Sequence, residues 1–106
     1  MKMLVNITFP MEPFNSMVIN GSAGEIIGRV VDDIKPESIY FTESDGNRAA
    51  VMVVEVPNAS SIPSIVEPWF LVFEAICEFK IAMTADDLKN ADLSSLGKKW
   101  KDLSTN

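Results

Sequence analysis

Glu67 is the side chain in this sequence that is best placed for acid–base chemistry. It stands directly before Pro68, and the aromatic residues Trp69 and Phe70 follow. A proline inside a helical pattern removes one backbone hydrogen bond, and a carboxyl group beside aromatic rings can act as a general acid or base at the mouth of a pocket. Glu67 is therefore the candidate catalytic residue. The alternative is that Trp69 and Phe70 simply belong to the hydrophobic core.

A second group of side chains consists of candidates for binding a ligand. Most of them are polar or amphipathic residues on expected strands, and they are Tyr40, Thr42, Arg48, Trp69, Glu78 and Lys80. If the strand residues of this group face an inner cleft, they can orient an anionic or aromatic ligand. If they lie at the rim of the sheet, they are ordinary cross-strand partners.

The chain contains no histidine and one cysteine, Cys77. The absence of histidine removes the commonest general base and the commonest transition-metal ligand, so we expect no metal site and no cofactor. Cys77 has no histidine to activate it and is expected to behave as a small hydrophobic residue. A single cysteine excludes an internal disulfide and fits a reducing compartment, which predicts a cytoplasmic protein.

Charge and hydropathy narrow the range of partners. The net charge of the 106 residues is −6, from 9 basic and 15 acidic side chains, and an acidic surface repels a phosphate backbone, so nucleic acid is not an expected partner. No apolar run approaches the ~20 residues of a membrane span. The hydrophobic content of 47% is high for a chain of this length and favours oligomerisation.

A β-hairpin is expected at the centre of the chain. Aromatic and β-branched residues at 39–43 and 48–56 flank Asp45-Gly46, and an Asp-Gly pair between two such runs is a strong hairpin signal. Gly46 takes a positive φ without steric cost, and Asp45 tolerates it.

Alternating or helical spacing of apolar residues predicts the remaining elements. We expect strands over 2–9 and 75–83, and helices over about 11–19, 22–34, from 62 onward and from 84 to about 91. Ser22 with Glu25, and Thr84 with Asp87, match capping boxes. Pro68 predicts either a kink in the third helix or the start of a new one. A final helical stripe consists of Leu93, Leu96, Trp100 and Leu103.

The resulting order is β-α-β-β-α-β, the ferredoxin-like α+β pattern, with helices on one face of a four-stranded antiparallel sheet. We expect one domain over 1–106, with a core of about 2–88 and a helical tail over about 89–106. Both faces of the sheet are expected to be apolar: Leu4, Tyr40, Ala50, Met52 and Val54 on one, and Val5, Ile39, Val51 and Val53 on the other. Helices cover only one face, so a homodimer joined sheet to sheet is expected. The tail can pack on its own domain edge or on the partner.

Several stretches resemble a family of small uncharacterised bacterial proteins that look like members of the dimeric α+β-barrel superfamily. They are 35–43, Asp45-Gly46, 67–70 and the run Ala82-Met83-Thr84-x-x-Asp87-Leu88. Muconolactone isomerases and antibiotic-biosynthesis monooxygenases are relatives at the superfamily level. The resemblance spans roughly residues 2–88 and implies the fold and a back-to-back sheet dimer. It implies no activity and no catalytic residue.

Two functions remain open. The first is a homodimeric module that binds a small molecule or another protein. The alternative is a cofactor-independent enzyme that acts on a small organic molecule in the cleft between sheet and helices.

Overall fold

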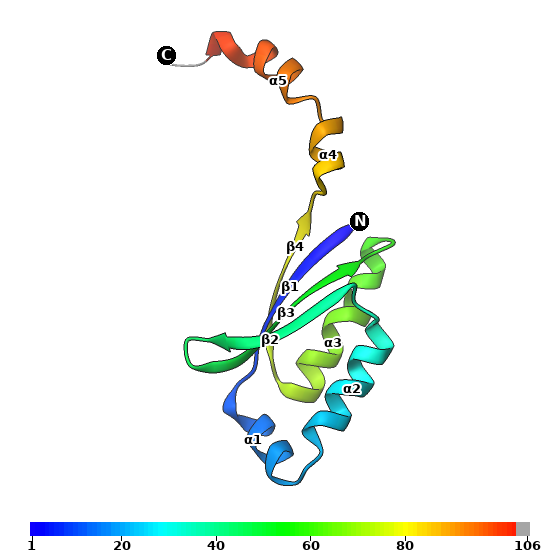
Figure 1. The fold of residues 1–106 in the computed structure, drawn as a ribbon, viewed down its shortest axis with the longest axis vertical. Coiled ribbons are helices and arrows are strands. Elements are labelled where there is room, and N and C mark those ends of the chain that lie inside the picture. Colours follow the sequence, from blue (N-terminus) through cyan, green and yellow to red (C-terminus); the bar gives the residue numbers. More distant parts are fainter. Residues whose placement is uncertain (104–106) are drawn as a thin grey trace.

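The computed structural model describes residues 1–103, and the last three residues of the expected tail, 104–106, lie outside the described part. Four strands form one antiparallel sheet in the order β2-β3-β1-β4, and α2 and α3 lie side by side over one of its faces (Figure 1). The predicted ferredoxin-like arrangement is therefore confirmed. In chain order the elements are β1 (Lys2–Thr8), α1 (Met11–Ile19), α2 (Ala23–Ile34), β2 (Ser38–Ser44), β3 (Asn47–Glu55), the 3-10 turn η1 (Ala59–Ser61), α3 (Ile62–Phe73), β4 (Ile76–Ala82), α4 (Ala85–Asn90), α5 (Leu93–Trp100) and the 3-10 turn η2 (Lys101–Leu103).

The predicted hairpin joins β2 to β3. Asp45 and Gly46 both have positive φ, 51° and 82°, as the two central residues of a tight hairpin turn require. The Gly46 N–H donates a 2.9 Å hydrogen bond to the Glu43 carboxylate. Ser44 pairs with Asn47 across the turn, and this local geometry sets the register of the whole pair.

The register corrects the expected division of the sheet into faces. Leu4 pairs with Val53, and Val5 pairs with Met52. The expectation that Ala50, Met52 and Val54 share a face with Leu4 and Tyr40 is therefore wrong: these three residues lie under the helices. Alternation within a strand is fixed by the pleat, but a slip of one residue between strands exchanges the faces.

The two faces differ in composition. The helix-covered face carries the buried core side chains Met3, Val5, Ile7, Ala50, Met52 and Val54. We call the opposite side the outer face, and the pairing places on it Leu4, Asn6, Thr8, Tyr40, Thr42, Ala49, Val51, Val53, Ile76, Glu78 and Lys80. The outer face is thus a mixture of apolar and polar side chains, whereas the sequence predicted a fairly apolar surface.

The helix boundaries agree with the prediction, but one expected cap is absent. Thr84 and Asp87 form the predicted capping box at the start of α4. Ser22 makes no side-chain capping bond to α2 because its backbone is already helical (φ −92°, ψ −12°), whereas a capping residue needs an extended backbone. The Ser22 N–H instead donates to the Asn20 side chain. Pro68 lies inside one continuous helix, α3.

The chain leaves the sheet after β4 and forms an arm. Residues 84–103, which we call the arm, carry α4, α5 and η2 away from the sheet (Figure 1), and every one of them is exposed. The described chain is consequently elongated, with extents of 63 × 29 × 20 Å. Within residues 1–103, no helix has both the length and the apolar composition needed to cross a membrane.

Candidate functional site

A polar hollow of about 290 Å³ opens on the outer face of the sheet. Asn6 and Thr8 come from β1, Thr42 from β2 and Glu78 from β4, so three strands contribute polar side chains to one depression. We call it the outer-face hollow. Its lining is Asn6, Ile7, Thr8, Thr42, Glu43, Ser44, Ala49, Ala50, Val51, Ile76 and Glu78.

The centre of the hollow is a small residue. Ala49 pairs with Thr8 on one side and with Thr42 on the other. Side chains directly opposite each other across antiparallel strands have Cβ atoms about 5 Å apart. The single methyl group of Ala49 therefore leaves a gap between two hydroxyl-bearing neighbours. The hollow results from the pairing of neighbouring strands, so the sequence of a single strand could not predict it.

The chemistry of the hollow favours ligands that donate hydrogen bonds. Asn6, Thr8 and Thr42 can donate or accept, whereas the carboxylate of Glu78 only accepts when ionised. No lysine or arginine lines the hollow. The arrangement therefore suits a small neutral or cationic molecule with hydroxyl or amino groups, and it disfavours the anionic ligand considered from the sequence.

The structure brings four of the seven sequence-predicted site residues to the same face. Thr42 and Glu78 line the hollow, and Tyr40 and Lys80 lie on neighbouring positions of the outer face. Tyr40 is 71% exposed, so its ring is free to contact another surface. Glu67, Arg48 and Trp69 lie elsewhere.

Arg48 ties the hairpin to α1 on the helix side of the sheet. Its Nη1 donates a 2.7 Å hydrogen bond to Asn15 Oδ1, and its guanidinium carbon lies 4.6 Å from the centre of the Phe14 ring. Together with Phe9, Ile27, Phe41, Thr42 and Ala49, Arg48 and Phe14 line a mostly apolar opening of about 380 Å³. The contacts give Arg48 a structural role in holding α1.

Trp69 and Glu67 point in different directions from α3. Trp69 is completely buried and packs on Phe9 and Phe73, with ring centres 6.0 and 5.8 Å apart. Glu67 is exposed to solvent. Trp69 is therefore a core residue, as the alternative interpretation of the sequence expected. Its ring does not enclose the Glu67 carboxyl group.

Cys77 lies on β4 beside the core, half-buried on the helix side. Burial raises the pKa of its thiol to about 11. The thiolate is the nucleophilic form of cysteine, so this residue is unreactive at neutral pH. Its environment agrees with the prediction of a small hydrophobic residue.

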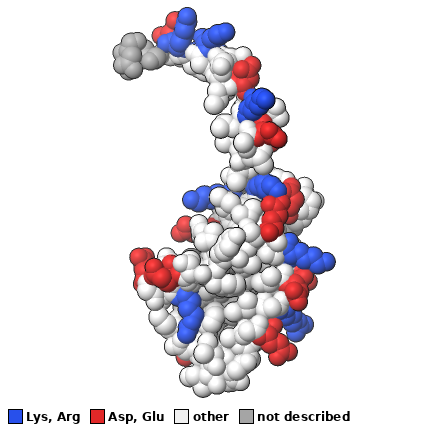
Figure 2. All heavy atoms as spheres, in the orientation of Figure 1, with Lys and Arg blue, Asp and Glu red and all other residues white. Residues whose placement is uncertain are grey.

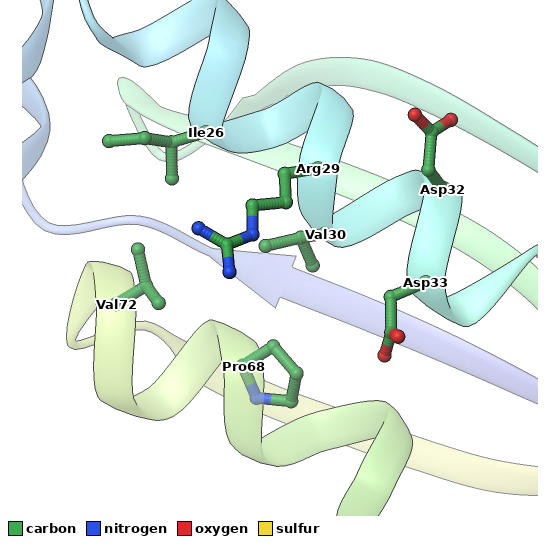
Figure 3. A pocket seen from close by; sticks show the side chains of 7 residues that line it. All are labelled: Ile26, Arg29, Val30, Asp32, Asp33, Pro68 and Val72. Carbon is green, nitrogen blue, oxygen red and sulfur yellow. The ribbon is translucent and has the colours of Figure 1, made fainter.

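A second, larger depression lies between α2 and α3, and no sequence pattern predicted it. It has a volume of about 840 Å³ and is lined by Ile26, Arg29, Val30, Asp32, Asp33, Pro68 and Val72. Figure 3 shows Arg29 extending between the two helices and Asp33 directed toward α3. We call it the α2–α3 groove. In the sequence, the only indication of this groove was the pair Asp32 and Asp33 near the end of α2. The groove itself forms only when α2 and α3 pack together.

Among residues 1–103, no three His, Cys, Asp or Glu side chains come close enough together to hold a metal ion. No protein-family model and no curated protein matches the chain.

Solved structures similar to this chain include an enzyme. The 5-chloro-2-hydroxyhydroquinone dehydrochlorinase TftG from Burkholderia phenoliruptrix AC1100, in complex with 2,5-dihydroxybenzoquinone, has a TM-score of 0.52 at 15% identity, covering 82% of this chain and 99% of its own. At this identity the similarity shows the fold alone, and it agrees with the ferredoxin-like sheet described above.

Two further structures are more distant. The de novo designed protein Ferredog-Diesel has a TM-score of 0.45 at 12% identity, covering 76% of this chain and 85% of its own. Protein Atu4242 from Agrobacterium tumefaciens has a TM-score of 0.40 at 12% identity, covering 80% of this chain and 96% of its own.

Proposed function

We propose that this protein is a homodimer joined through the outer faces of its sheets, and that it binds a small organic molecule in the outer-face hollow. The observation that carries the proposal is the uncovered outer face. Leu4, Val51 and Ile76 are 37%, 40% and 67% exposed there, although they belong to the central and edge strands of the sheet. A second sheet is the simplest cover, because identical patches pair about a two-fold axis.

Dimer formation changes the character of the hollow. Sheets packed face to face lie about 10 Å apart, so a second outer face places a lid over the hollow. Removal of water strengthens the hydrogen bonds that Asn6, Thr42 and Glu78 make to a ligand. The hollow of about 290 Å³ would then become one wall of an enclosed site.

The likeness to the dehydrochlorinase adds limited support. That protein is bound to 2,5-dihydroxybenzoquinone, which is a small molecule with hydroxyl groups. Only the size of that molecule bears on the outer-face hollow, because the hydroxyl groups of a dihydroxybenzoquinone ionise at neutral pH and the hollow, lined by Glu78 without lysine or arginine, disfavours an anion. Binding without catalysis is the function that we favour.

The alternative is a cofactor-independent enzyme acting on a small organic molecule. Glu78 favours it, because its carboxylate lines the hollow and can accept a proton from a bound ligand. Glu67, the candidate from the sequence, is exposed on α3 and does not line the hollow.

Sedimentation and ligand binding test the proposal together. At micromolar concentration the chain should sediment at about twice its mass of 11.7 kDa. A panel of small hydroxylated aromatic compounds should raise the melting temperature, and Glu78→Gln and Thr42→Val should abolish that effect.

Glu67→Gln is the matched control for Glu78→Gln, because it makes the same chemical change outside the hollow. If Glu67→Gln abolishes ligand binding and Glu78→Gln does not, the site lies near α3 and the outer-face hollow is excluded. Turnover of a bound compound, lost in Glu78→Gln, would establish the enzyme alternative.

A further inference from the structure

The arm is an amphipathic segment without support from its own domain. Leu88, Leu93, Leu96, Trp100 and Leu103 are between 43% and 74% exposed. In α5, Leu93, Leu96 and Trp100 follow the spacing of three and four that places side chains on one helix face. An apolar stripe of this kind is typical of a helix that packs against another surface.

The length of the arm helices also requires a packing partner. α4 has six residues and α5 has eight, and isolated helices shorter than about 12–15 residues are marginal in water. Side-chain caps begin both helices, at Thr84 and at Asp92. Caps define where a helix starts, but its stability comes mainly from packing of the apolar face.

Charge indicates the kind of surface that receives the arm. The arm carries four lysines and four aspartates, so the net charge of −6 lies entirely on residues 1–83. The far half of the arm, 93–103, has three lysines and one aspartate, and Figure 2 shows lysine side chains along this end. A basic amphipathic helix complements an acidic surface with an apolar floor.

The α2–α3 groove has these properties. Ile26, Val30, Pro68 and Val72 supply an apolar floor and walls, and Asp32 and Asp33 lie at its end. Arg29 extends across the groove (Figure 3), and a guanidinium can stack on an aromatic ring. Helices commonly bind in such grooves by their apolar face.

We propose that the arm of one chain exchanges onto a second copy, where α5 lies in the partner's α2–α3 groove. This inference rests on the proposed homodimer and adds a second interface to it. Leu93, Leu96 and Trp100 face the apolar floor. Lys99 is three residues after Leu96 and therefore lies on the same side of the helix, where it meets Asp33 at the acidic end of the groove. Each chain gives one arm and receives one, as two-fold symmetry requires.

The reach of the arm is comparable with the distance to the partner's helix layer. Because α5 itself occupies the groove, the reach comes from the residues before it: α4 spans about 9 Å at 1.5 Å per residue, and the connecting residues add about 10 Å. The partner's helix layer begins about 20 Å away, across one spacing between sheets and one layer of side chains and helix. Docking in its own groove would instead require the arm to reverse direction after β4, which it leaves pointing away from the helices (Figure 1).

Disulfide trapping between full-length chains tests the exchange. In a Cys77→Ser background, one chain carries Leu96→Cys and the other carries Val72→Cys, and the two are mixed and oxidised. We expect a disulfide between the two chains. The matched control pairs Leu96→Cys with Ile19→Cys, which is 85% exposed on α1 and outside the groove, and should give no specific product.

The other outcomes separate the two proposals. A disulfide formed only within a chain that carries both cysteines shows that the arm folds back on its own domain and overturns the exchange. A dimer by sedimentation with no trapped product also overturns the exchange, and leaves the sheet-to-sheet dimer standing. A monomer by sedimentation with no product overturns both.

Charge reversal gives a second measurement that does not depend on cysteine geometry. Lys99→Glu should weaken dimerisation about three- to ten-fold, because it places two like charges together. Asp33→Lys in the same chain should restore the affinity. Lys98→Glu is the matched control, since Lys98 lies on the opposite side of α5 from Leu96 and Trp100. Equal effects of Lys98→Glu and Lys99→Glu, without rescue by Asp33→Lys, would contradict the docking geometry.

Discussion

At the scale of single residues, burial decides which side chains are available for chemistry. Glu67 and Trp69 stand two positions apart on α3, yet one is exposed and the other is completely buried. Two residues along a helix differ by about 200° in direction. Neighbours in sequence are therefore not neighbours on the surface, and the acid–base pattern expected around Glu67 does not assemble there.

The thiol of Cys77 provides a residue-level prediction. Because burial raises its pKa from 9.0 to about 11, alkylation by iodoacetamide should be slow at pH 8 and its rate should rise with a midpoint near pH 11. The raised pKa also means that this residue's contribution to stability is complete below pH 9 and is lost as the pH rises toward 11.

A cysteine at an exposed position outside both proposed interfaces is the control for that measurement. Ile19→Cys in a Cys77→Ser background should react with the midpoint of an ordinary thiol, because Ile19 is 85% exposed on α1. Equal rates for the two cysteines at pH 8 would show that Cys77 is not protected by burial.

Trp69 provides a second prediction at this scale. Trp69→Ala should lower the free energy of unfolding by about 3–5 kcal/mol, because it leaves a large cavity in the aromatic cluster. Leu71→Ala, on the same helix but 77% exposed, should change it by less than about 0.5 kcal/mol. Urea unfolding of both variants measures the difference, and similar midpoints would place Trp69 outside the core.

Trp69 also carries a polar group without a partner. Its Nε1–H is buried and meets no acceptor among residues 1–103, and an unpaired buried donor costs stability. Trp69→Phe removes this group while keeping an aromatic ring, so it should cost clearly less than Trp69→Ala.

At the scale of elements, the hairpin is where local chemistry and the observed structure agree most closely. Asp45 and Gly46 adopt the backbone conformation that their residue types favour, and the turn then aligns Tyr40 with Val51 and Thr42 with Ala49. A two-residue turn therefore determines which side chains reach the outer-face hollow.

Gly46→Val tests this element. The glycine has φ 82°, where a β-branched residue is strained, so the variant should lose at least about 1–2 kcal/mol and melt at a lower temperature. Gly46→Asn is the control, because asparagine tolerates this conformation. No neighbouring atom lies within 4 Å of a Cβ at this position, so the change in stability reports the backbone strain alone. An unchanged melting temperature for Gly46→Val would show that the turn is of a different type.

At the scale of the whole molecule, the chain presents two incomplete surfaces: an uncovered outer face and an arm without a support. Both are explained by a second copy of the chain. The sheet supplies the first interface of the proposed dimer, and the arm supplies the second.

Val51→Glu tests the first interface. Val51 is 40% exposed at the centre of the outer face, so a carboxylate there should be tolerated by a single chain but should separate two sheets, because it would be buried without a partner. We expect sedimentation near 11.7 kDa with a normal circular dichroism spectrum.

Ile19→Glu is the control for Val51→Glu, since Ile19 is 85% exposed on α1 and lies outside both proposed interfaces. It should leave the dimer intact. A Val51→Glu dimer with unchanged affinity would exclude the outer face as the interface.

The sequence by itself determined the order of the elements and most of their boundaries. Hydrophobic spacing, Asp45-Gly46 and the Thr84–Asp87 box act over a few residues, and the structure has the hairpin, the helices and the cap where these patterns predicted them. Even the apolar stripe of the arm was evident from the spacing of Leu93, Leu96 and Trp100.

Only the tertiary structure decided which side chains meet. The pairing of Leu4 with Val53 moved Met52 under the helices, and the same pairing brought Asn6, Thr42 and Glu78 from three strands into one hollow. The α2–α3 groove likewise exists only once two helices pack. Register and packing depend on residues far apart in the chain, and a change of one position in pairing exchanges the two faces of a strand without altering any local pattern.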